Sequence, residues 1–351
     1  MATPLKIAVI YPKDDPKVSS IGNEATCITE GLLSKAKRTG AIEYRFYDNE
    51  RDPIKTISVA EAIAKEKFDI AIGTVTSSEA IAAAKILNQA QIPFFATTAT
   101  NPEVTKDKPY SFRLPFDDYH QAQTLAGFVA KEQRPQKVAV VKNISLPYSE
   151  FLATEFSSHL KSLGPKIAIN QFNIIEGFSQ YGTLVDKIMA FKPDVIFVPI
   201  YAPDAAKLYN ELAARPGKFS LVGSDTIGGR DSFFKVLKGT SQRISLVFVK
   251  SWADGPDGPE KEAFLKAHAT YCKDQNVTVI SAAAYDVVRA TLLGFQKNEK
   301  ARGLDMISTI KNLGYAGVTG VFHHNSNGEP DKPLFLHKIE NGRSIFWKKY
   351  P

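Results

Sequence analysis

Short apolar runs alternate with amphipathic segments over most of the chain. The apolar runs have the length and composition of buried strands, and the segments between them repeat apolar residues at helical spacing. Continuous apolar strands separated by amphipathic helices are typical of parallel sheets that carry helices on both faces. The expected strands cover residues 5–11, 42–48, 68–73, 92–97, 137–142, 166–172, 194–200, 219–223 and 244–250. The expected helices cover residues 24–38, 56–67, 78–90, 118–133, 149–163, 179–191, 203–214 and 231–238.

The alternation of strands and helices occurs twice. It stops at "FRLPFDDYHQ" (112–121) and begins again at Lys137. After Trp252 helices are expected at 259–274, 281–297 and 304–313, followed by short β-like stretches. We therefore expect an α/β protein of two doubly wound parallel-sheet lobes joined by a multi-strand hinge. The expected lobes are 1–117 with 253–325 and 118–252 with 326–351, and the expected hinge lies near 115–120, 248–255 and 322–332.

Composition and charge narrow the class of protein. The chain has 351 residues, of which 44% are hydrophobic and 23% charged, as in ordinary globular domains. Its net charge of +7 is spread along the chain, without the dense basic stripe of a nucleic-acid-binding protein. No apolar run reaches the roughly eighteen residues of a membrane span. The opening "MATPLKIAVIYP" lacks the basic and apolar regions of a secretory signal, so the sequence fits either a cytoplasmic protein or a mature, exported chain.

The two cysteines, Cys27 and Cys272, stand far apart and lack the spacing of metal ligands. A framework of several disulfides is excluded, and a single disulfide is not. We expect both to be small, buried apolar residues.

Candidate chemistry lies in the loops that follow strands, because ligands of open α/β sheets bind beyond the carboxyl ends of strands. In "GTVTSSEA" (73–80), Ser77 or Ser78 is expected to cap a helix. The N–H groups at such a helix start suit a carboxylate, although the serine could simply be a cap. In "FFATTATNP" (94–102), Thr98 and Thr100 offer hydroxyls, in a stretch that also reads as an ordinary turn.

The second half of the chain offers aromatic and acidic groups at equivalent places. Tyr148 and Tyr201 follow expected strands, and Asp225 stands at a strand end among small residues. A lone Asp is often a cap, but facing a cleft it would be a fixed negative charge for a cation. One lobe would supply a helix start and hydroxyl groups, and the other an acid and two aromatic rings. Together these groups complement the charges of an α-amino acid.

Motifs of other classes are missing from the sequence. It contains no GxSxG, HExxH, P-loop or CxxC pattern, and "YPKDDP" stands where a Rossmann fingerprint would need glycines. We therefore expect no enzyme activity, no cofactor and no metal. A transcription regulator's sensor core remains an alternative, but no helix-turn-helix precedes Leu5.

Over residues 5–347 the chain resembles the type I periplasmic solute-binding proteins, in the leucine/isoleucine/valine branch of ABC uptake systems. The resemblance rests on these stretches: "YDNERDP" (47–53), "AIGTVTSSEAIAAAKILNQAQIPFFATTATNPEVT" (71–105), "SFRLPFDDYHQAQTLAGFV" (111–129), "KVAVVKNISLPYSEF" (137–151), "GFSQYGTLVDKI" (177–188) and "LVGSD" (221–225).

The resemblance implies a role for each candidate residue. Ser77, beside Ser78, would hold the ligand carboxylate, and Thr100 would touch both carboxylate and amino group. Thr98 would accept from the amino group through its backbone carbonyl. The ammonium would pair with Asp225, and Tyr148 and Tyr201 would close the cleft.

The resemblance also implies a periplasmic monomer that delivers a small amino-acid-like ligand to an ABC permease, with no nucleic-acid partner. Four departures concern the side-chain pocket: "PYS" where Tyr-Gly is usual, an unusual first loop, a short segment between the first helix and the second strand ("KRTGAIEYRF", 37–46), and Asp225 in place of a longer Glu. A sensor or receptor domain for an amide or small carboxylic acid is therefore a second reading. Weaker candidates for the pocket are Tyr11, Lys13, Ile21, Trp252 and Ile280.

Overall fold

The computed structural model describes residues 3–13, 21–227, 233, 245–250, 258–273, 275–325, 329–340 and 343–350. The chain divides into two compact units, and it passes between them three times. Unit 1 comprises Met1–Asp117 and Asp254–Lys332, and unit 2 comprises Asp118–Ala253 and Pro333–Pro351. The third passage follows Lys332, whereas the sequence pattern placed it after residue 325.

Unit 1 is built on a parallel sheet of five short strands in the order β2-β1-β3-β4-β5. The central strands are entirely buried, which explains why they read as continuous apolar runs. β5 was not expected, because its three residues are too few to show a period. The strands are β1 (Leu5–Ile10), β2 (Ile42–Tyr47), β3 (Ile70–Gly73), β4 (Phe94–Ala96) and β5 (Ser111–Arg113).

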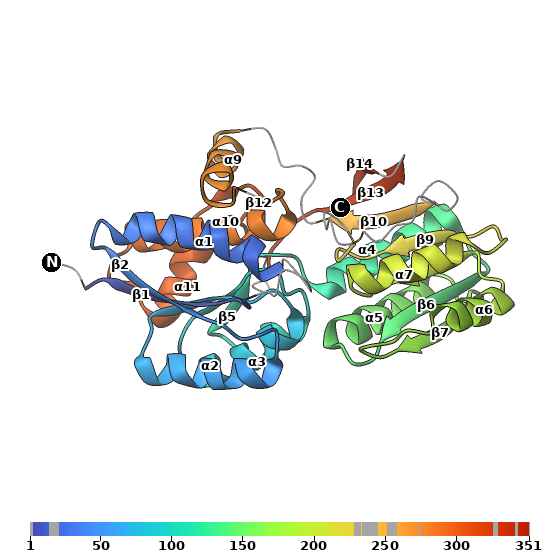
Figure 1. Ribbon diagram of the computed structural model, residues 1–351, viewed down its shortest axis with the longest axis horizontal. Helices are drawn as coiled ribbons and strands as arrows, with labels where there is room; N and C mark the ends of the chain where they lie inside the picture. Colours follow the sequence, from blue (N-terminus) through green and yellow to red (C-terminus); the bar gives the residue numbers. More distant parts are fainter. Residues whose placement is uncertain are drawn as a thin grey trace. The chain divides into compact units, whose positions relative to one another are not determined.

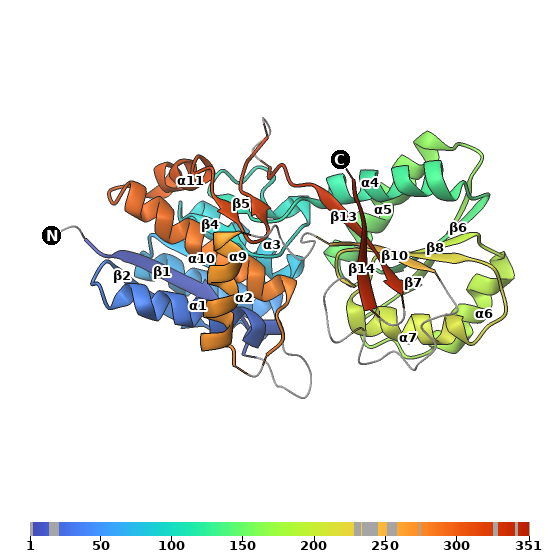
Figure 2. The ribbon, with the colours of Figure 1, turned by 90° about the horizontal axis from the view of Figure 1, so that it is seen from above.

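Helices from both ends of the chain cover the sheet of unit 1. Figure 1 shows α1 beside α10 on one face and α2 beside α3 on the other. The return of the chain to this unit, expected from its late run of helices, is visible in the orange segments of Figure 2. The helices are α1 (Ile21–Lys37), α2 (Pro53–Glu66), α3 (Ser77–Gln89), α9 (Pro259–Tyr271), α10 (Val279–Lys297) and α11 (Gly303–Lys311). A 3-10 turn at Pro102–Val104 and the short pair β11 (Ala316–Gly317) and β12 (Gly320–Val321) complete the described elements.

Unit 2 has a seven-stranded sheet in the order β14-β13-β10-β9-β8-β6-β7. β10, β9, β8, β6 and β7 run parallel, whereas β13 and β14 pair antiparallel at one edge, seen in red in Figure 2. The α/β class with two parallel-rich sheets is thereby confirmed. The strands are β6 (Lys137–Asn143), β7 (Ala168–Ile174), β8 (Val195–Val198), β9 (Ser220–Gly223), β10 (Leu246–Lys250), β13 (Leu334–Glu340) and β14 (Arg343–Tyr350).

The helices of unit 2 pack in pairs, α4 with α5 and α6 with α7. Their buried faces are apolar; the core beneath α6 and α7 includes Val185, Leu208 and Ile196 at 0% exposure. The helices are α4 (Asp118–Phe128), which continues as a π-helical turn at Val129–Gln133, α5 (Pro147–Leu163), α6 (Tyr181–Phe191) and α7 (Ala202–Ala213). The helix expected at 231–238 lies outside the described residues except for Phe233.

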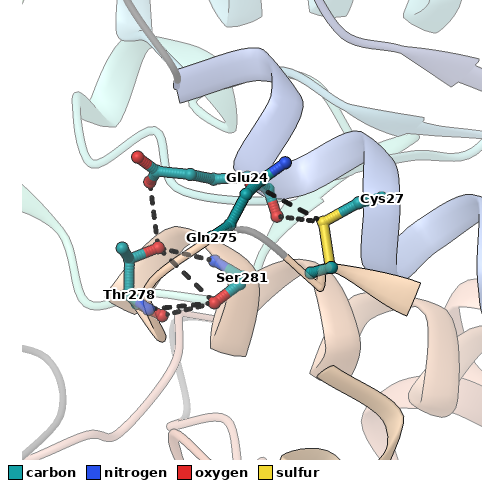
Figure 3. Close-up of a disulfide and its surroundings, with 6 residues drawn as sticks. Glu24, Cys27, Gln275, Thr278 and Ser281 are labelled. Carbon is teal, nitrogen blue, oxygen red and sulfur yellow. Dashed lines mark hydrogen bonds between the residues drawn. A yellow bond between two sulfur atoms is a disulfide. The ribbon is translucent and has the colours of Figure 1, made fainter. Parts of the chain in front are cut away.

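The two cysteines form the single disulfide that the sequence left open, so the expectation that both are simply small apolar residues was wrong. Cys27 on α1 and Cys272, which follows α9, form a disulfide with Cα atoms 5.3 Å apart (Figure 3). The two residues are 245 positions apart in the sequence, and the return of the chain to unit 1 brings them together. Sequence distance therefore carried no information on their distance in space.

Candidate functional site

The loop between β3 and α3 begins at Gly73, where glycine is required. Its φ is +135°, and a Cβ atom there would lie 2.2 Å from the carbonyl oxygen of Ile10 on the neighbouring strand. The loop then runs through Thr76, the residue that precedes α3. The end of β3 therefore lies close against the end of β1.

The N-cap of α3 is Thr76, and not Ser77 or Ser78 as expected. Ser77 and Ser78 are the first two helical residues, and Ser77 is buried. The Thr76 hydroxyl does not cap the helix; it donates to Oε1 of Glu79 at 3.0 Å. The N–H groups of residues 77–79 consequently have no acceptor within the described part of the chain. These free donors at the positive end of a helix suit an anionic group.

The threonines after β4 fall into two kinds. The Thr97 hydroxyl pairs with Tyr11 Oη at 2.8 Å, and the Thr98 hydroxyl donates to the carbonyl of Val75 at 2.8 Å. The hydroxyl of Thr100, which is buried, has no partner among the residues the structure describes. Thr98 can therefore serve a ligand through its backbone, and Thr100 through its hydroxyl.

A hydrogen bond connects the two loops of unit 1. The N–H of Asn101 donates to Oγ of Ser77 at 3.4 Å, so Thr100 lies next to the start of α3. This proximity follows from the sheet order, because β3 and β4 are neighbours and their loops leave the same edge. The arrangement gathers hydroxyl and N–H donors at one place, as a carboxylate would need.

Arg113 supports the Thr100 loop from inside unit 1, and sequence reasoning missed it. Its fully buried guanidinium donates to the carbonyls of Asn101 at 2.9 Å and Ala99 at 3.4 Å, on either side of Thr100. Its Nε lies 2.8 Å from Oε2 of Glu329. A lone arginine inside the apolar stretch "SFRLPF" was the signal that could have revealed this role.

In unit 2 an aromatic and acidic cluster forms around Asp225. Oδ1 of Asp225 accepts from the Tyr148 hydroxyl at 2.6 Å and from Nε2 of Gln121 at 3.1 Å. Oε1 of Gln121 accepts the N–H of Asp225 at 2.9 Å, which fixes the amide orientation. The rings of Tyr148 and Tyr201 stack at 5.6 Å with an angle of 5°. The structure thus brings all three candidates of this unit together.

Burial keeps the Tyr148 phenol protonated. Desolvation, with the nearby carboxylates of Asp225 and Asp118, raises the pKa of Tyr148 well above 10. Tyr148 therefore acts as a donor to Asp225 at all ordinary pH values. Gln121, which also donates to Asp118 at 3.0 Å, was not found from the sequence, where it is one polar residue of "DDYHQ".

The weaker pocket candidates are scattered. Tyr11 is buried, and burial raises its pKa to about 12. Lys13 is exposed, with its N–H donating to Asp48 at 2.9 Å. Ile280 is fully buried near the start of α10, as a core residue would be. Trp252 and the side chain of Ile21 lie outside what the structure describes. No group of three or more His, Cys, Asp or Glu among the described residues could hold a metal ion.

Comparison with known proteins gives a consistent family. The profile of the periplasmic binding protein family matches residues 33–343. The Leu/Ile/Val-binding protein BraC3 of Rhizobium johnstonii is 24% identical over 97% of this chain and 93% of its own. A leucine-binding protein, LivK, of Thermotoga maritima has a similar structure, with a TM-score of 0.85, 21% identity and 98% coverage of both chains.

A further solved structure has a different ligand. A solute-binding protein of an ABC transporter from Rhodopseudomonas palustris, in complex with 4-hydroxybenzoate, has a TM-score of 0.84 and 19% identity, covering 99% of this chain and 97% of its own. Within the described residues no helix is long and apolar enough to cross a membrane. The chain belongs to the periplasmic binding protein family, a family of solute-binding proteins rather than enzymes.

Proposed function

We propose that this protein captures an amino acid, or a related small zwitterion, and delivers it to an ABC permease. The observation that carries the proposal is a group of donors in unit 1 that have no acceptor among the described residues: the hydroxyl of Thr100 and the N–H groups of residues 77–79. Polar groups left without partners are costly unless a ligand satisfies them. The ligand carboxylate binds there, beside Ser77 and Ser78.

The ammonium group of the ligand binds to Asp225 in unit 2. The Asp225 carboxylate is oriented by hydrogen bonds from Tyr148 and Gln121, and Tyr201 stacks on Tyr148. The acid and the two aromatic rings therefore form one prearranged group. The carbonyl of Thr98 is a second acceptor for the ammonium. Each half of the proposed site rests on contacts within its own unit.

The expected strength of the site fits a solute-capture protein. A charge-assisted hydrogen bond contributes roughly 1.5–3 kcal/mol, and burial of a small apolar side chain adds roughly the same. Two or three such bonds with that burial approach ~8 kcal/mol, or a Kd of about 1 μM. In the proposed cycle the ligand binds unit 1 first, and the second unit then closes on it around the three crossings of the chain.

The disulfide supports an extracytoplasmic location. Disulfides form and persist in oxidising compartments such as the bacterial periplasm, and are rare in the cytosol of mesophiles. The Cys27–Cys272 bond therefore favours an exported protein. We propose that it works as a monomer beside its membrane partner.

A second candidate ligand class is a carboxylic acid without an ammonium group. A relative of similar fold carries 4-hydroxybenzoate, and Asp225 of this chain already accepts two hydrogen bonds within its own unit. With such a ligand, Asp225 would orient Tyr148 instead of pairing with a cation. A sensor or receptor role would use the same site without a permease.

Calorimetry with two sets of ligands separates these possibilities. L-leucine, L-isoleucine and L-valine form one set, and benzoate and 4-hydroxybenzoate the other. Binding of the amino acids supports the proposal, and binding of only the benzoates supports the second candidate. If no compound with a carboxylate binds, the carboxylate site at α3 is wrong. Stimulation of the permease ATPase by the loaded protein in proteoliposomes then tests transport against sensing.

A further inference from the structure

The start of α3 has the sequence of a capping box, but the side chain of its first residue does not cap the helix. Thr76-Ser77-Ser78-Glu79 matches the pattern in which the first side chain accepts the N–H of the fourth residue, and the fourth side chain accepts the N–H of the first. In the structure the Thr76 hydroxyl instead donates to Glu79 and leaves the helix uncapped. The backbone of Thr76 is extended (φ −123°, ψ 160°), as in an N-cap, so only the side chain departs from the motif.

The start of α10, in the same unit, shows the completed motif. The Thr278 hydroxyl accepts from the N–H of Ser281 at 3.2 Å, and Oγ of Ser281 accepts the N–H of Thr278 at 3.0 Å (Figure 3). Both are helices of unit 1 preceded by an extended threonine. In both, the threonine hydroxyl donates to a carboxylate: at α10 to Oε2 of Glu24 on α1, at 2.9 Å, and at α3 to Glu79. They differ in where that carboxylate stands. Glu24 lies outside α10, and the Thr278 oxygen still accepts from Ser281, whereas Glu79 is the fourth residue of the motif itself.

Glu79 is built into the protein interior. Its exposure is 1%, its Oε1 accepts the Thr76 hydroxyl, and its Oε2 has no hydrogen-bond partner in the described part of the chain. Burial raises the pKa of Glu79, while Thr76, Asn49 and Arg51 act in the opposite direction. Burying a carboxylate with an unused oxygen is unfavourable, so its presence here calls for a role.

We propose that Glu79 is a positioning residue: by accepting the Thr76 hydroxyl it keeps the first turn of α3 uncapped, so that its N–H groups remain available to the ligand carboxylate. The part of this inference that concerns the ligand rests on the proposed function. The part that concerns the uncapped start of α3 does not. A freed Thr76 hydroxyl would turn to accept from residue 78 or 79, as N-cap threonines do. It would then compete with the ligand for the same donors.

The first test uses the protein without ligand. Amide hydrogen exchange at residues 78 and 79 is measured by NMR in wild type, E79M, E79Q and the double variant E79M/T76V. In E79M the new cap slows exchange of one of these amides about three- to tenfold. In E79Q the amide oxygen still accepts from Thr76, and in the double variant no hydroxyl remains, so exchange stays as in wild type. Unchanged exchange in E79M overturns the inference.

The second test measures the affinity of each variant for L-leucine or 4-hydroxybenzoate, using the ligand that the wild-type protein binds. E79M weakens affinity about three- to tenfold, and E79M/T76V recovers the wild-type value, which a general loss of stability would not produce. T76V alone, the matched control, binds as wild type does. Failure of the double variant to recover affinity overturns the role of Glu79 in binding. If wild type binds neither ligand, the proposed function is contradicted. The hydrogen-exchange experiment still tests, on its own, whether Glu79 keeps the start of α3 uncapped.

Discussion

The two units differ in how far the protein satisfies the polar groups of the proposed site. In unit 1 the first N–H groups of α3 and the Thr100 hydroxyl have no partner within the described residues. In unit 2 the carboxylate of Asp225 is already bonded to Tyr148 and Gln121. Donors without a partner suit the carboxylate of any ligand. The prearranged network around Asp225 instead distinguishes ligands that carry an ammonium group from ligands that do not. Unit 1 is therefore expected to set affinity, and unit 2 to set ligand class.

The units also differ in covalent constraint, and this gives the largest expected effect. The Cys27–Cys272 disulfide joins two segments of unit 1. In C27S/C272S the free energy of unfolding should fall by about 2–5 kcal/mol, because the cross-link no longer restricts the unfolded chain. Denaturant unfolding measures this, with reduced wild type as the control. Equal stability of variant and wild type would contradict a contribution of the bond to unit 1.

Removal of the donors of unit 1 should weaken all carboxylate ligands alike. S77A/T100V loses two hydroxyls, and Kd is expected to rise about 100-fold or more for amino acids and aromatic acids, whichever bind. T98V is the matched control: its hydroxyl serves Val75, so affinity should change far less. Calorimetry gives both values. A loss confined to one ligand class would refute the idea that unit 1 reads only the carboxylate.

Substitution in unit 2 should separate the ligand classes. D225N keeps the shape of the side chain and removes its charge, so Kd for L-leucine should rise about tenfold or more. Affinity for 4-hydroxybenzoate, if present, should change little. Similar losses for both ligands, or for neither, would show that Asp225 does not pair with an ammonium.

The smallest expected effect is a dependence on alkaline pH through Tyr11 in unit 1. Its folded pKa of about 12 lies above the ordinary value of 10, so the folded state holds its proton longer than the unfolded state. This contribution to stability is complete below pH 10 and is lost as pH rises through about 12. The stability difference between wild type and Y11F, followed by thermal unfolding between pH 9 and 11, should therefore shrink at the high end. A constant difference would mean that the pKa is not raised.

Particular elements show what local pattern could predict. Strands such as β3 and β4 are buried on both faces, and their apolar runs were recognised because burial leaves no polar position. β5 was not predicted, because its three residues are too few to show a pattern. The helix start at α3 was found, but its cap was misplaced by one or two residues, since serine and threonine are equally good caps in sequence.

The residues of the candidate site also divide into those that the sequence could predict and those that it could not. Ser77, Thr100, Tyr148 and Asp225 could be nominated because each follows a strand, and strand ends are where ligands bind in such sheets. Arg113, Gln121 and Glu79 could not, because they act through partners that are distant in sequence or through a side-chain rotamer. Nothing in the local pattern specifies which threonine of "TTAT" keeps a free hydroxyl.

The sequence by itself determined the α/β class, the doubled alternation and the strand ends that carry polar groups, because hydrophobic period and turn residues act over a few positions. Only the tertiary structure decided that Cys27 meets Cys272, that Thr98 is used internally while Thr100 is not, and that Thr76 leaves α3 uncapped. Those outcomes depend on which segments the fold brings within hydrogen-bonding distance, and sequence spacing does not encode that distance.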